Sequence, residues 1–392
     1  MNDRLINTLN VKNILSFGSS IASIPLSPLN VLIGANGSGK SNLIEIISLF
    51  QALPKDQTSP IKGVRDWIWK GDKDSTALVE ALIECPMIQY YGEEKQSLKY
   101  SMKFVSDSQR FHLVDEQLEN SKPKEGEDAP YFYYRYENNH PVLNVKAGER
   151  RLQRESVTPD KSILSQRKDP DQYPELTWLG EQFNKVRIYR EWSFGRQAPL
   201  RQSQEPDAPN DFLTEDCKNL GLILNSLKRE PKVKKQILKL LAEFYEGIED
   251  FDVIIEGGSV QLFLTEGDFA IPATRLSDGT LRYICLLAIL CHPKPPPLIC
   301  IEEPELGIHT DIIPTLAKLL KEASARTQLI VTTHSEALID ELSDTPESVL
   351  VCEKNNGCTE FKRLERDALK DWLEKYSLGE LWRKGEIGGN RW

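Results

Sequence analysis

The chain has 392 residues, of which 40% are hydrophobic and 28% charged, an ordinary globular composition for a chain long enough to form two or three domains. Its 49 basic and 59 acidic side chains give a net charge of −10, which argues against a protein coated in nucleic acid but leaves room for one local basic face. The longest apolar run, residues 283–291, is far shorter than the ~18 residues of a membrane helix, and the seven cysteines show no CxxC spacing, so we expect a cytoplasmic protein with reduced core cysteines, no zinc and no membrane contact.

The first elements that we expect are short strands over residues 5–33, of which the apolar stretch 29–33 is buried. Residues 41–51 then carry apolar side chains around most of a helical surface, which predicts a buried helix. Residues 77–105 read as two antiparallel strands joined by a turn around 91–93.

The middle of the chain is less regular. From 106 to 174 the strand pattern dissolves into polar, turn-rich sequence, which is typical of surface loops. Two helices are predicted over 211–229 and 232–246, and from residue 251 strands and helices alternate. This order indicates one α/β head interrupted by an inserted domain. We expect an N-terminal lobe over 1–105, a polar and helical lid over 106–246, and a C-terminal lobe over 247–392.

Residues 34–41, G-A-N-G-S-G-K-S, match the phosphate-binding pattern G-x-x-x-x-G-K-[ST] and lie between a predicted strand and a predicted helix, as that pattern requires. Its glycines let backbone N–H groups close around phosphate oxygens at a helix N-terminus. Lys40 would reach the β- and γ-phosphates, and the Ser41 hydroxyl would ligate Mg²⁺. The nucleotide-binding residues are therefore predicted to be Gly34, Asn36, Gly37, Ser38, Gly39, Lys40, Ser41 and Asn42.

Two further apolar stretches end in chemically useful side chains. Residues 298–301 lead into Glu302 and Glu303, and residues 328–333 lead into His334. Because ligands bind at the carboxyl ends of parallel strands, all three side chains are expected to face one crevice. Glu302 would hold Mg²⁺ and Glu303 would accept a proton from the attacking water. Taken alone, the acidic pair could be a solvated turn and the histidine a structural one.

Residues 275–282, R-L-S-D-G-T-L-R, precede a strongly apolar helix. Read alone, Ser277 is a helix N-cap with Gly279 in the first turn. In this order, however, the four elements resemble an ABC-type ATPase of the RecF/SMC-like branch, similar to OLD-type heads and to bacterial AAA-type ATPases that lack a Toprim nuclease domain. The resemblance is carried by residues 1–50 and 251–340.

The resemblance implies an ABC-type head: a P-loop sheet with helices, an antiparallel β lobe and an inserted lid. It implies that Ser277 and Gly279 form a signature motif that contacts the γ-phosphate of ATP bound to a second copy, so that ATP holds a homodimer together. It assigns catalytic roles to Glu303 as base, His334 as switch histidine and Lys40. The signature departs from many ABC proteins at Asp278, and no Q-loop glutamine can be placed, since the context of Gln89 is wrong.

The segment 185–239 carries a net charge of +5. Its interleaved arginines and aromatic residues suit contacts with phosphates and bases of double-stranded DNA, and a solvated lid in which arginines cover apolar surface is the alternative. The C-terminal stretch 382–392 could dock a partner protein or pack on its own head. The arginines and aromatic residues of segment 185–239 that could contact DNA are Arg187, Tyr189, Arg190, Trp192, Phe194, Arg196 and Arg201.

The sequence thus predicts an ATP-hydrolysing enzyme that dimerises around ATP and gates DNA binding, a separately encoded effector such as a nuclease, or both, in DNA repair or anti-phage defence. The 235 residues between Ser41 and Ser277 lack the heptads of a long SMC arm, and the 58 after His334 are too few for a Toprim domain. The alternatives are a transporter's nucleotide-binding subunit and a scaffold that holds an effector without binding DNA.

Overall fold

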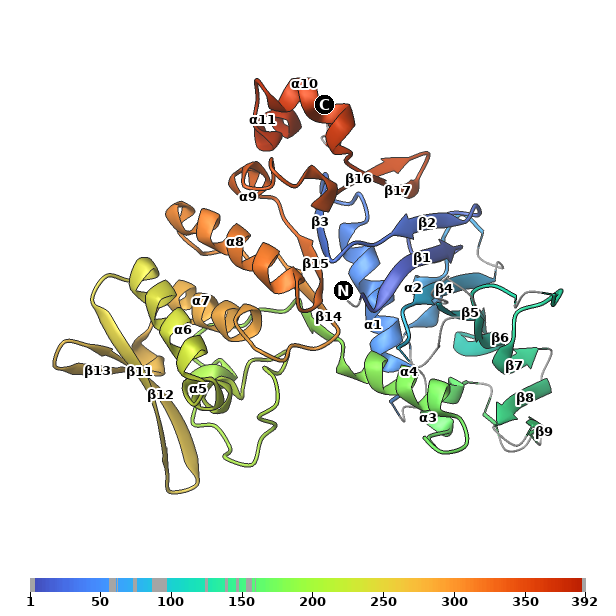
Figure 1. Cartoon of the computed structure of the whole chain (residues 1–392), viewed down its shortest axis with the longest axis horizontal. Helices are drawn as coiled ribbons and strands as arrows, with labels where there is room; N and C mark the ends of the chain where they lie inside the picture. The colour runs from blue at the N-terminus through green and yellow to red at the C-terminus, as the bar shows by residue number, and fades with distance from the viewer. Residues whose placement is uncertain are drawn as a thin grey trace. The chain divides into compact units, whose positions relative to one another are not determined.

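The computed structural model describes residues 4–55, 61, 63–72, 76–86, 97–123, 126–137, 140–145, 148–152, 157–158 and 160–389. The chain divides into two compact units (Figure 1). Unit 1 comprises Met1–Val186, Leu350–Arg363 and Gly388–Trp392, and unit 2 comprises Arg187–Val349 and Leu364–Ile387. The three-part division into 1–105, 106–246 and 247–392 stays a prediction.

An eight-stranded antiparallel sheet, in the order β2-β1-β4-β5-β6-β7-β8-β9, forms much of unit 1. Along β4 every second side chain is fully buried, so one face of the sheet packs on a core. The predicted antiparallel pair over 77–105 is confirmed as β4 and β5, and its turn at 91–93 lies outside the described residues. The strands are β1 (Ile6–Lys12), β2 (Ala22–Pro25), β4 (Ala77–Ile83), β5 (Leu98–Asp107), β6 (Arg110–Asn120), β7 (Phe132–Glu137), β8 (His140–Val145) and β9 (Gly148–Arg151).

The prediction that regular structure dissolves after residue 106 is wrong, because β6 to β9 continue this sheet. The inward face of β6 carries Glu116, which is fully buried. Its carboxylate accepts hydrogen bonds from Tyr100 Oη at 2.6 Å, Ser162 Oγ at 2.5 Å and the backbone N–H of Ile163 at 2.9 Å. A buried carboxylate whose oxygens all accept hydrogen bonds can lie in a protein core. In the sequence, however, a glutamate at an inward position interrupts the alternation of apolar and polar residues by which a strand is predicted.

The remaining elements of unit 1 include β3 (Leu29–Ile33), whose five residues are all buried, and α1 (Lys40–Ala52), whose apolar side chains are nearly all buried. Both confirm the predicted strand and helix. Helix α1 packs on α4 (Pro174–Lys185), with the rings of Phe50 and Phe183 4.9 Å apart. The other elements are α2 (Val64–Trp67), α3 (Ile163–Gln166), and the antiparallel hairpin of β16 (Val349–Asn355) and β17 (Cys358–Arg363).

Unit 2 contains three parallel strands, β10 (Arg187–Tyr189), β14 (Leu298–Glu302) and β15 (Gln328–Thr332), in that order. Every residue of α7 (Asp278–Leu290) from its third position onward is buried, as expected for a helix that is apolar all round. A second sheet, β11-β12-β13, is antiparallel and contacts α5 and α6. The remaining bounds are α5 (Leu220–Lys228), α6 (Pro231–Phe244), β11 (Ile248–Glu256), β12 (Ser259–Glu266), β13 (Phe269–Pro272), α8 (Ile313–Ser324), α9 (Glu336–Asp340), α10 (Arg366–Leu373) and α11 (Leu378–Arg383).

The helices predicted over 211–229 and 232–246 are present as α5 and α6, but α5 begins only at Leu220. The side-chain amide of Asn219 donates to the carbonyl oxygens of Pro209 and Phe212, at 2.6 and 2.9 Å, and this ties the preceding residues into a loop.

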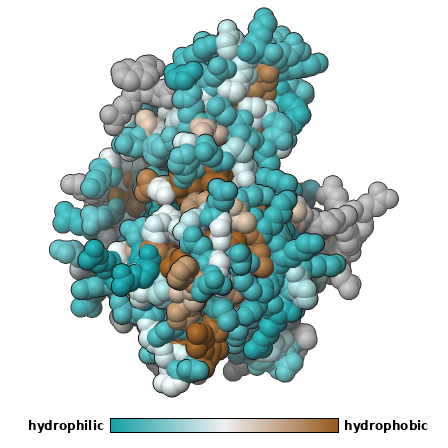
Figure 2. Space-filling view, turned by 90° about the vertical axis from the view of Figure 1, so that its left-hand side faces the viewer, coloured by the Kyte–Doolittle hydropathy of each residue, from teal (hydrophilic) through white to brown (hydrophobic). Residues whose placement is uncertain are grey.

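Most of the cysteines lie in the core, as their positions in apolar stretches predict. All seven cysteines are free, and six of them are buried. Among the described residues, no helix is both long and apolar enough to cross a bilayer. The face drawn in Figure 2 is mostly hydrophilic with separate apolar patches.

Candidate functional site

In unit 1 the predicted phosphate-binding loop joins β3 to α1, and its backbone admits only glycine at two positions. Gly34 has φ +152° and Gly39 has φ +113°, in the region that side chains disfavour. A Cβ at Gly34 would lie 2.3 Å from the carbonyl oxygen of Cys352, and one at Gly39 would lie 2.1 Å from Oγ1 of Thr359. The loop is therefore pressed against the β16–β17 hairpin.

The same loop concentrates positive charge at the start of α1. Gly39 is the N-cap and has no side chain to satisfy the first N–H groups of the helix, and no acidic residue lies in the first turn. The Lys40 ammonium group is buried and donates to the carbonyl oxygens of Gly34 at 2.7 Å and Ala35 at 3.2 Å. A helix N-terminus with a lysine folded over it fits a polyphosphate, which would replace the two carbonyls as the partner of Lys40.

A hydrogen-bonded network behind the loop was missed by the sequence analysis. Thr359 Oγ1 donates to Ser16 Oγ at 2.6 Å and lies 2.7 Å from the carbonyl oxygen of Ser38, and Asn42 Nδ2 donates to the same Ser16 Oγ at 2.6 Å. Thr359 is 321 residues from Ser38 in the chain. No local pattern indicates such a contact, which only the β16–β17 hairpin creates.

In unit 2 the predicted catalytic pair lies at the ends of adjacent parallel strands. Glu303 follows β14 with φ +46°, a left-handed conformation that is strained for a residue with a side chain, and its N–H donates to the carbonyl oxygen of Thr332 at 3.0 Å. Nε2 of His334 lies 4.0 Å from Oε1 of Glu303, and the two side chains are 38% and 43% exposed. The structure thus brings these two residues together where a water molecule can reach them.

Glu302, the predicted magnesium ligand, is hydrogen-bonded to an arginine. Its Oε1 accepts a hydrogen bond from Arg190 Nε at 3.2 Å, and its backbone oxygen accepts one from Trp192 Nε1 at 3.1 Å. A carboxylate at a strand end is the oxygen ligand that Mg²⁺ prefers, so the residue fits the metal. Arg190 supplies the positive charge at this carboxylate in the present structure.

Glu305 is a third carboxylate at the end of β14, and the sequence analysis gave it no role. Its Oε1 accepts hydrogen bonds from Thr333 Oγ1 at 2.5 Å and from the N–H of His334 at 3.2 Å. Burial is the main cause that raises the pKa of Glu305, and the neighbouring Glu303 adds to it, against the lowering effect of the Thr333 hydrogen bond. Glu305 therefore ties the loop after β14 to the loop that carries His334.

The signature residues adopt the N-cap geometry that Ser277 alone suggests. Ser277 Oγ accepts the N–H of Thr280 at 3.1 Å, and it shares a second hydrogen bond of 2.8 Å with Thr280 Oγ1, in which either hydroxyl can be the donor. A Cβ on Gly279 would lie only 2.6 Å from the carbonyl oxygen of Gly307, in the loop after Glu305. The two residues line a cavity of about 790 Å³, together with Phe244, Tyr245, Ile271, Arg275, Leu276, Thr280, Gly307, Ile308 and His309.

Arg282, one turn further along α7, connects the signature helix to the other loops of unit 2. It donates to the carbonyl oxygen of Leu306, and its guanidinium lies over the rings of Trp192 and Phe194, 5.0 and 5.5 Å from their centroids. The ring centroids of Tyr189 and Trp192 are 5.6 Å apart, and those of Trp192 and Phe194 are 5.7 Å apart. These aromatic side chains stack on one another within unit 2. Their packing therefore accounts for the aromatic residues of this segment without any contact to nucleic-acid bases.

The C-terminal helix α11 packs on its own unit and includes residues 382–383 of the stretch 382–392, whose role in docking a partner stays a prediction. Leu378 and Leu381 are buried, and Arg383 Nη1 lies 3.0 Å from Glu336 Oε1 on α9. Residues 390–392 lie outside the described residues.

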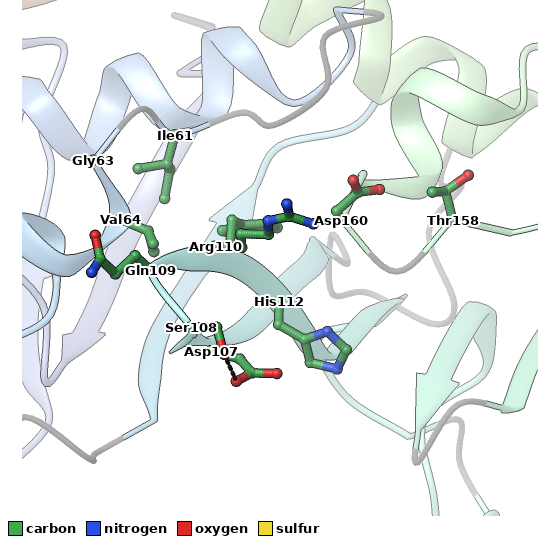
Figure 3. Close-up of a pocket in the computed structure, with 11 residues that line it drawn as sticks. Ile61, Gly63, Val64, Asp107, Ser108, Gln109, Arg110, His112, Thr158 and Asp160 are labelled. Carbon is green, nitrogen blue, oxygen red and sulfur yellow. Dashed lines mark hydrogen bonds between the residues drawn. The ribbon is translucent and has the colours of Figure 1, made fainter.

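A further cavity, of about 980 Å³, lies in unit 1 at the turn between β5 and β6 (Figure 3). Its polar lining includes Arg110, His112 and Asp160, and none of the predicted site residues lines it.

Comparison with known proteins gives a family and a fold. A family model described as "AAA domain, putative AbiEii toxin, Type IV TA system" matches residues 29–340. A search of the curated proteins found no match. Among solved structures, the chain is similar to an Smc head bound to the C-winged helix domain of ScpA, with 15% identity, a TM-score of 0.58, and coverage of 93% of this chain and 99% of that one.

Two further Smc head structures are similar. One, from Pyrococcus furiosus, has an extended coiled coil and is bound to the C-terminal domain of ScpA; it is 14% identical with a TM-score of 0.58, and the match covers 95% of this chain and 99% of that one. The other, from Pyrococcus yayanosii, has a coiled coil and joint, 14% identity, a TM-score of 0.50 and the same coverage. The predicted fold, an α/β ABC-type head, is confirmed as that of an SMC head.

Proposed function

The chain belongs to the AAA-domain family whose model spans residues 29–340, and from that premise we propose that it binds and hydrolyses ATP as an ABC-type ATPase of the RecF/SMC-like branch. The observation that carries the proposal is the pairing of Glu303 and His334, 4.0 Å apart at the ends of adjacent parallel strands. Within unit 1, the geometry of the glycine loop and Lys40 supports the proposal that they bind the phosphates of ATP.

Each residue then has a distinct task. Lys40 and the N–H groups at the start of α1 would bind the phosphates; Ser41 is the Mg²⁺ ligand that we propose in unit 1, and Glu302 is the one that we propose in unit 2. Bound Mg²⁺ would neutralise the charge on the phosphate oxygens. Glu303 accepts the proton of the attacking water, and His334 donates a hydrogen bond that holds the reacting group in place.

The signature residues act on a second copy of the chain. Ser277 can donate its hydroxyl proton when Thr280 is the donor of the hydrogen bond that the two hydroxyls share, and the N-terminus of α7 carries partial positive charge, so both suit the γ-phosphate of ATP bound to the partner's P-loop. ATP then stabilises a homodimer and hydrolysis releases it, because the triphosphate favours the closed state through contacts from both sides.

The switch would act on DNA, on an effector protein, or on both. The Smc heads in two of the similar structures are bound to ScpA, which supports a separately encoded protein partner here. That this partner is an effector such as a nuclease is part of the proposal. The family description, which names a toxin of a toxin–antitoxin system, favours a role in defence over one in DNA repair. A transporter subunit and an effector-holding scaffold that does not bind DNA are the competing functions.

The deciding experiment measures phosphate release by the purified chain with Mg²⁺ and ATP, in the presence and absence of double-stranded DNA. Lys40→Ala serves as the matched inactive variant. Turnover that depends on Lys40 and rises with DNA supports the DNA-gated ATPase. Turnover that DNA leaves unchanged favours the scaffold or transporter reading, and turnover that survives Lys40→Ala contradicts the ATP site.

A further inference from the structure

Arg201 is a buried charge in unit 2 that the proposed chemistry does not use. It ends the short 3₁₀ turn η2 (Pro199–Arg201), and its side chain is only 6% exposed. A buried guanidinium is tolerated only when its N–H groups have partners, so the identity of those partners shows what the residue holds.

All three guanidinium nitrogens of Arg201 donate hydrogen bonds, and most go to the segment just before α7. Nε donates to the carbonyl oxygen of Phe194 at 2.8 Å. Nη1 donates to the carbonyl oxygens of Ala273 at 3.0 Å and Leu276 at 2.7 Å, with Thr274 at 3.4 Å. Three carbonyl oxygens of the turn η3 (Ala273–Arg275) and its C-cap thus converge on one cation.

Nη2 completes the set by donating to Asp278 Oδ1 at 2.5 Å. Asp278 is the first residue of α7 and directly follows the N-cap Ser277. The Arg201 contacts therefore lie on both sides of Ser277: the carbonyl oxygen of Leu276 precedes it and the Asp278 carboxylate follows it. Arg201 thus holds the backbone before Ser277 and the side chain after it, while the bonds of Ser277 Oγ to Thr280 orient the hydroxyl itself.

We propose that Arg201 and Asp278 form a clamp that positions Ser277 for the γ-phosphate bound to a second copy of this chain. The inference rests on the proposed function, in which Ser277 meets that phosphate. The clamp explains why the signature contains an aspartate: without Asp278, Nη2 of Arg201 would lose its hydrogen-bond acceptor. Both are positioning residues, since neither needs to touch the nucleotide.

The competing explanation is a general one: an acidic residue in the first turn of any helix offsets the helix dipole. Substitutions of Asp278 distinguish the clamp from the dipole effect. Asp278→Asn removes the charge but keeps an oxygen for Arg201, whereas Asp278→Ala removes both. Asp367→Ala, in the exposed first turn of α10, is the matched control for the dipole effect. Asp278 is 67% exposed, so its substitution leaves the core intact, unlike that of Arg201.

The experiment uses the full chain in a Glu303→Gln background, with light scattering as a function of ATP concentration. We expect Asp278→Ala to raise the ATP concentration for half-maximal association about tenfold, the loss of one charge-assisted hydrogen bond. Asp278→Asn should shift it by less than about threefold, and Asp367→Ala should not shift it. Binding of a fluorescent ATP analogue to the monomer should stay the same in all variants, because that affinity depends on the P-loop.

Three results overturn the proposal in different ways. If the Glu303→Gln protein associates with ATP and Asp278→Ala associates at the same ATP concentration, the clamp is refuted and the proposed function stands. If the Glu303→Gln protein binds ATP and remains monomeric, the sandwich model itself fails, and the clamp loses its purpose with it. Equal defects in Asp278→Asn and Asp278→Ala would assign the effect to charge alone and also refute the clamp.

Discussion

Gly279→Ala tests whether the signature helix and the loop after Glu305 are packed as closely as the structure has them. On helix propensity alone, alanine should be favoured over glycine by about 1 kcal/mol in the first turn of α7. The structure predicts the opposite sign, because the new Cβ would lie 2.6 Å from the carbonyl oxygen of Gly307. A backbone oxygen has no rotamer with which to move away, so the loop itself must shift.

The size of the effect follows from that distance. Relieving the contact to an ordinary van der Waals separation needs a shift of about 1 Å, and overpacking of this kind costs about 1–3 kcal/mol of folding stability. The displaced loop begins at Glu305, which holds the N–H of His334, and a misplacement of about 1 Å near a reacting centre can cost about 100-fold in rate. We therefore expect lower stability together with a large loss of turnover.

Urea unfolding gives the free energy of unfolding, and phosphate release gives the turnover number. Gly195→Ala is the control, because nothing lies within 4 Å of a Cβ at Gly195 and its backbone is not left-handed. That variant should unfold at or slightly above the wild-type midpoint and hydrolyse ATP normally. A Gly279→Ala protein that is as stable and as active as Gly195→Ala would refute the close packing of Gly279 against Gly307.

Four further outcomes are expected. Lys40→Ala should abolish phosphate release without changing the thermal unfolding midpoint, because Lys40 lies in a ligand loop, and a lowered midpoint would contradict this. Glu303→Gln should still bind a fluorescent ATP analogue but hydrolyse ATP about 10² to 10⁴ times more slowly, since an amide cannot accept the proton. Arg190→Gln should lower the Mg²⁺ concentration needed for half-maximal nucleotide binding, because it removes the cation now held by Glu302, and an unchanged value would exclude that competition. Burial raises the pKa of Glu305, so its ionisation opposes folding, and the stability of Glu305→Gln relative to wild type should rise as the pH increases through that raised pKa; urea unfolding at pH 4 and pH 8 tests the sign.

The parts of the fold that the sequence could predict are those in which local pattern and burial agree. Strands β3, β14 and β15 are apolar runs buried along almost their entire length, and each leads into a glycine or a polar side chain at its carboxyl end. The pairing of β14 with β15 then brings Glu303 and His334 together, because parallel neighbours end at the same edge.

What the sequence could not provide is the set of contacts that hold these loops in place. Thr359 supports the P-loop from a hairpin more than 300 residues away, and Glu305 holds the His334 loop through hydrogen bonds that no motif implies. Such contacts depend on tertiary structure, so each side chain looks ordinary in the sequence.

In the basic segment 185–239, the net charge counted from the sequence exceeds the positive charge that can contact DNA at the surface. Arg190 pairs with Glu302, and Arg201 is buried among carbonyl oxygens, so neither adds to an outward positive field. Replacing Arg201 would disturb the signature loop and report on DNA only indirectly. Exposed side chains such as Arg196, Lys232 and Lys235 are the sound choice for testing a DNA face, since their loss removes charge without removing a structural contact that the fold depends on.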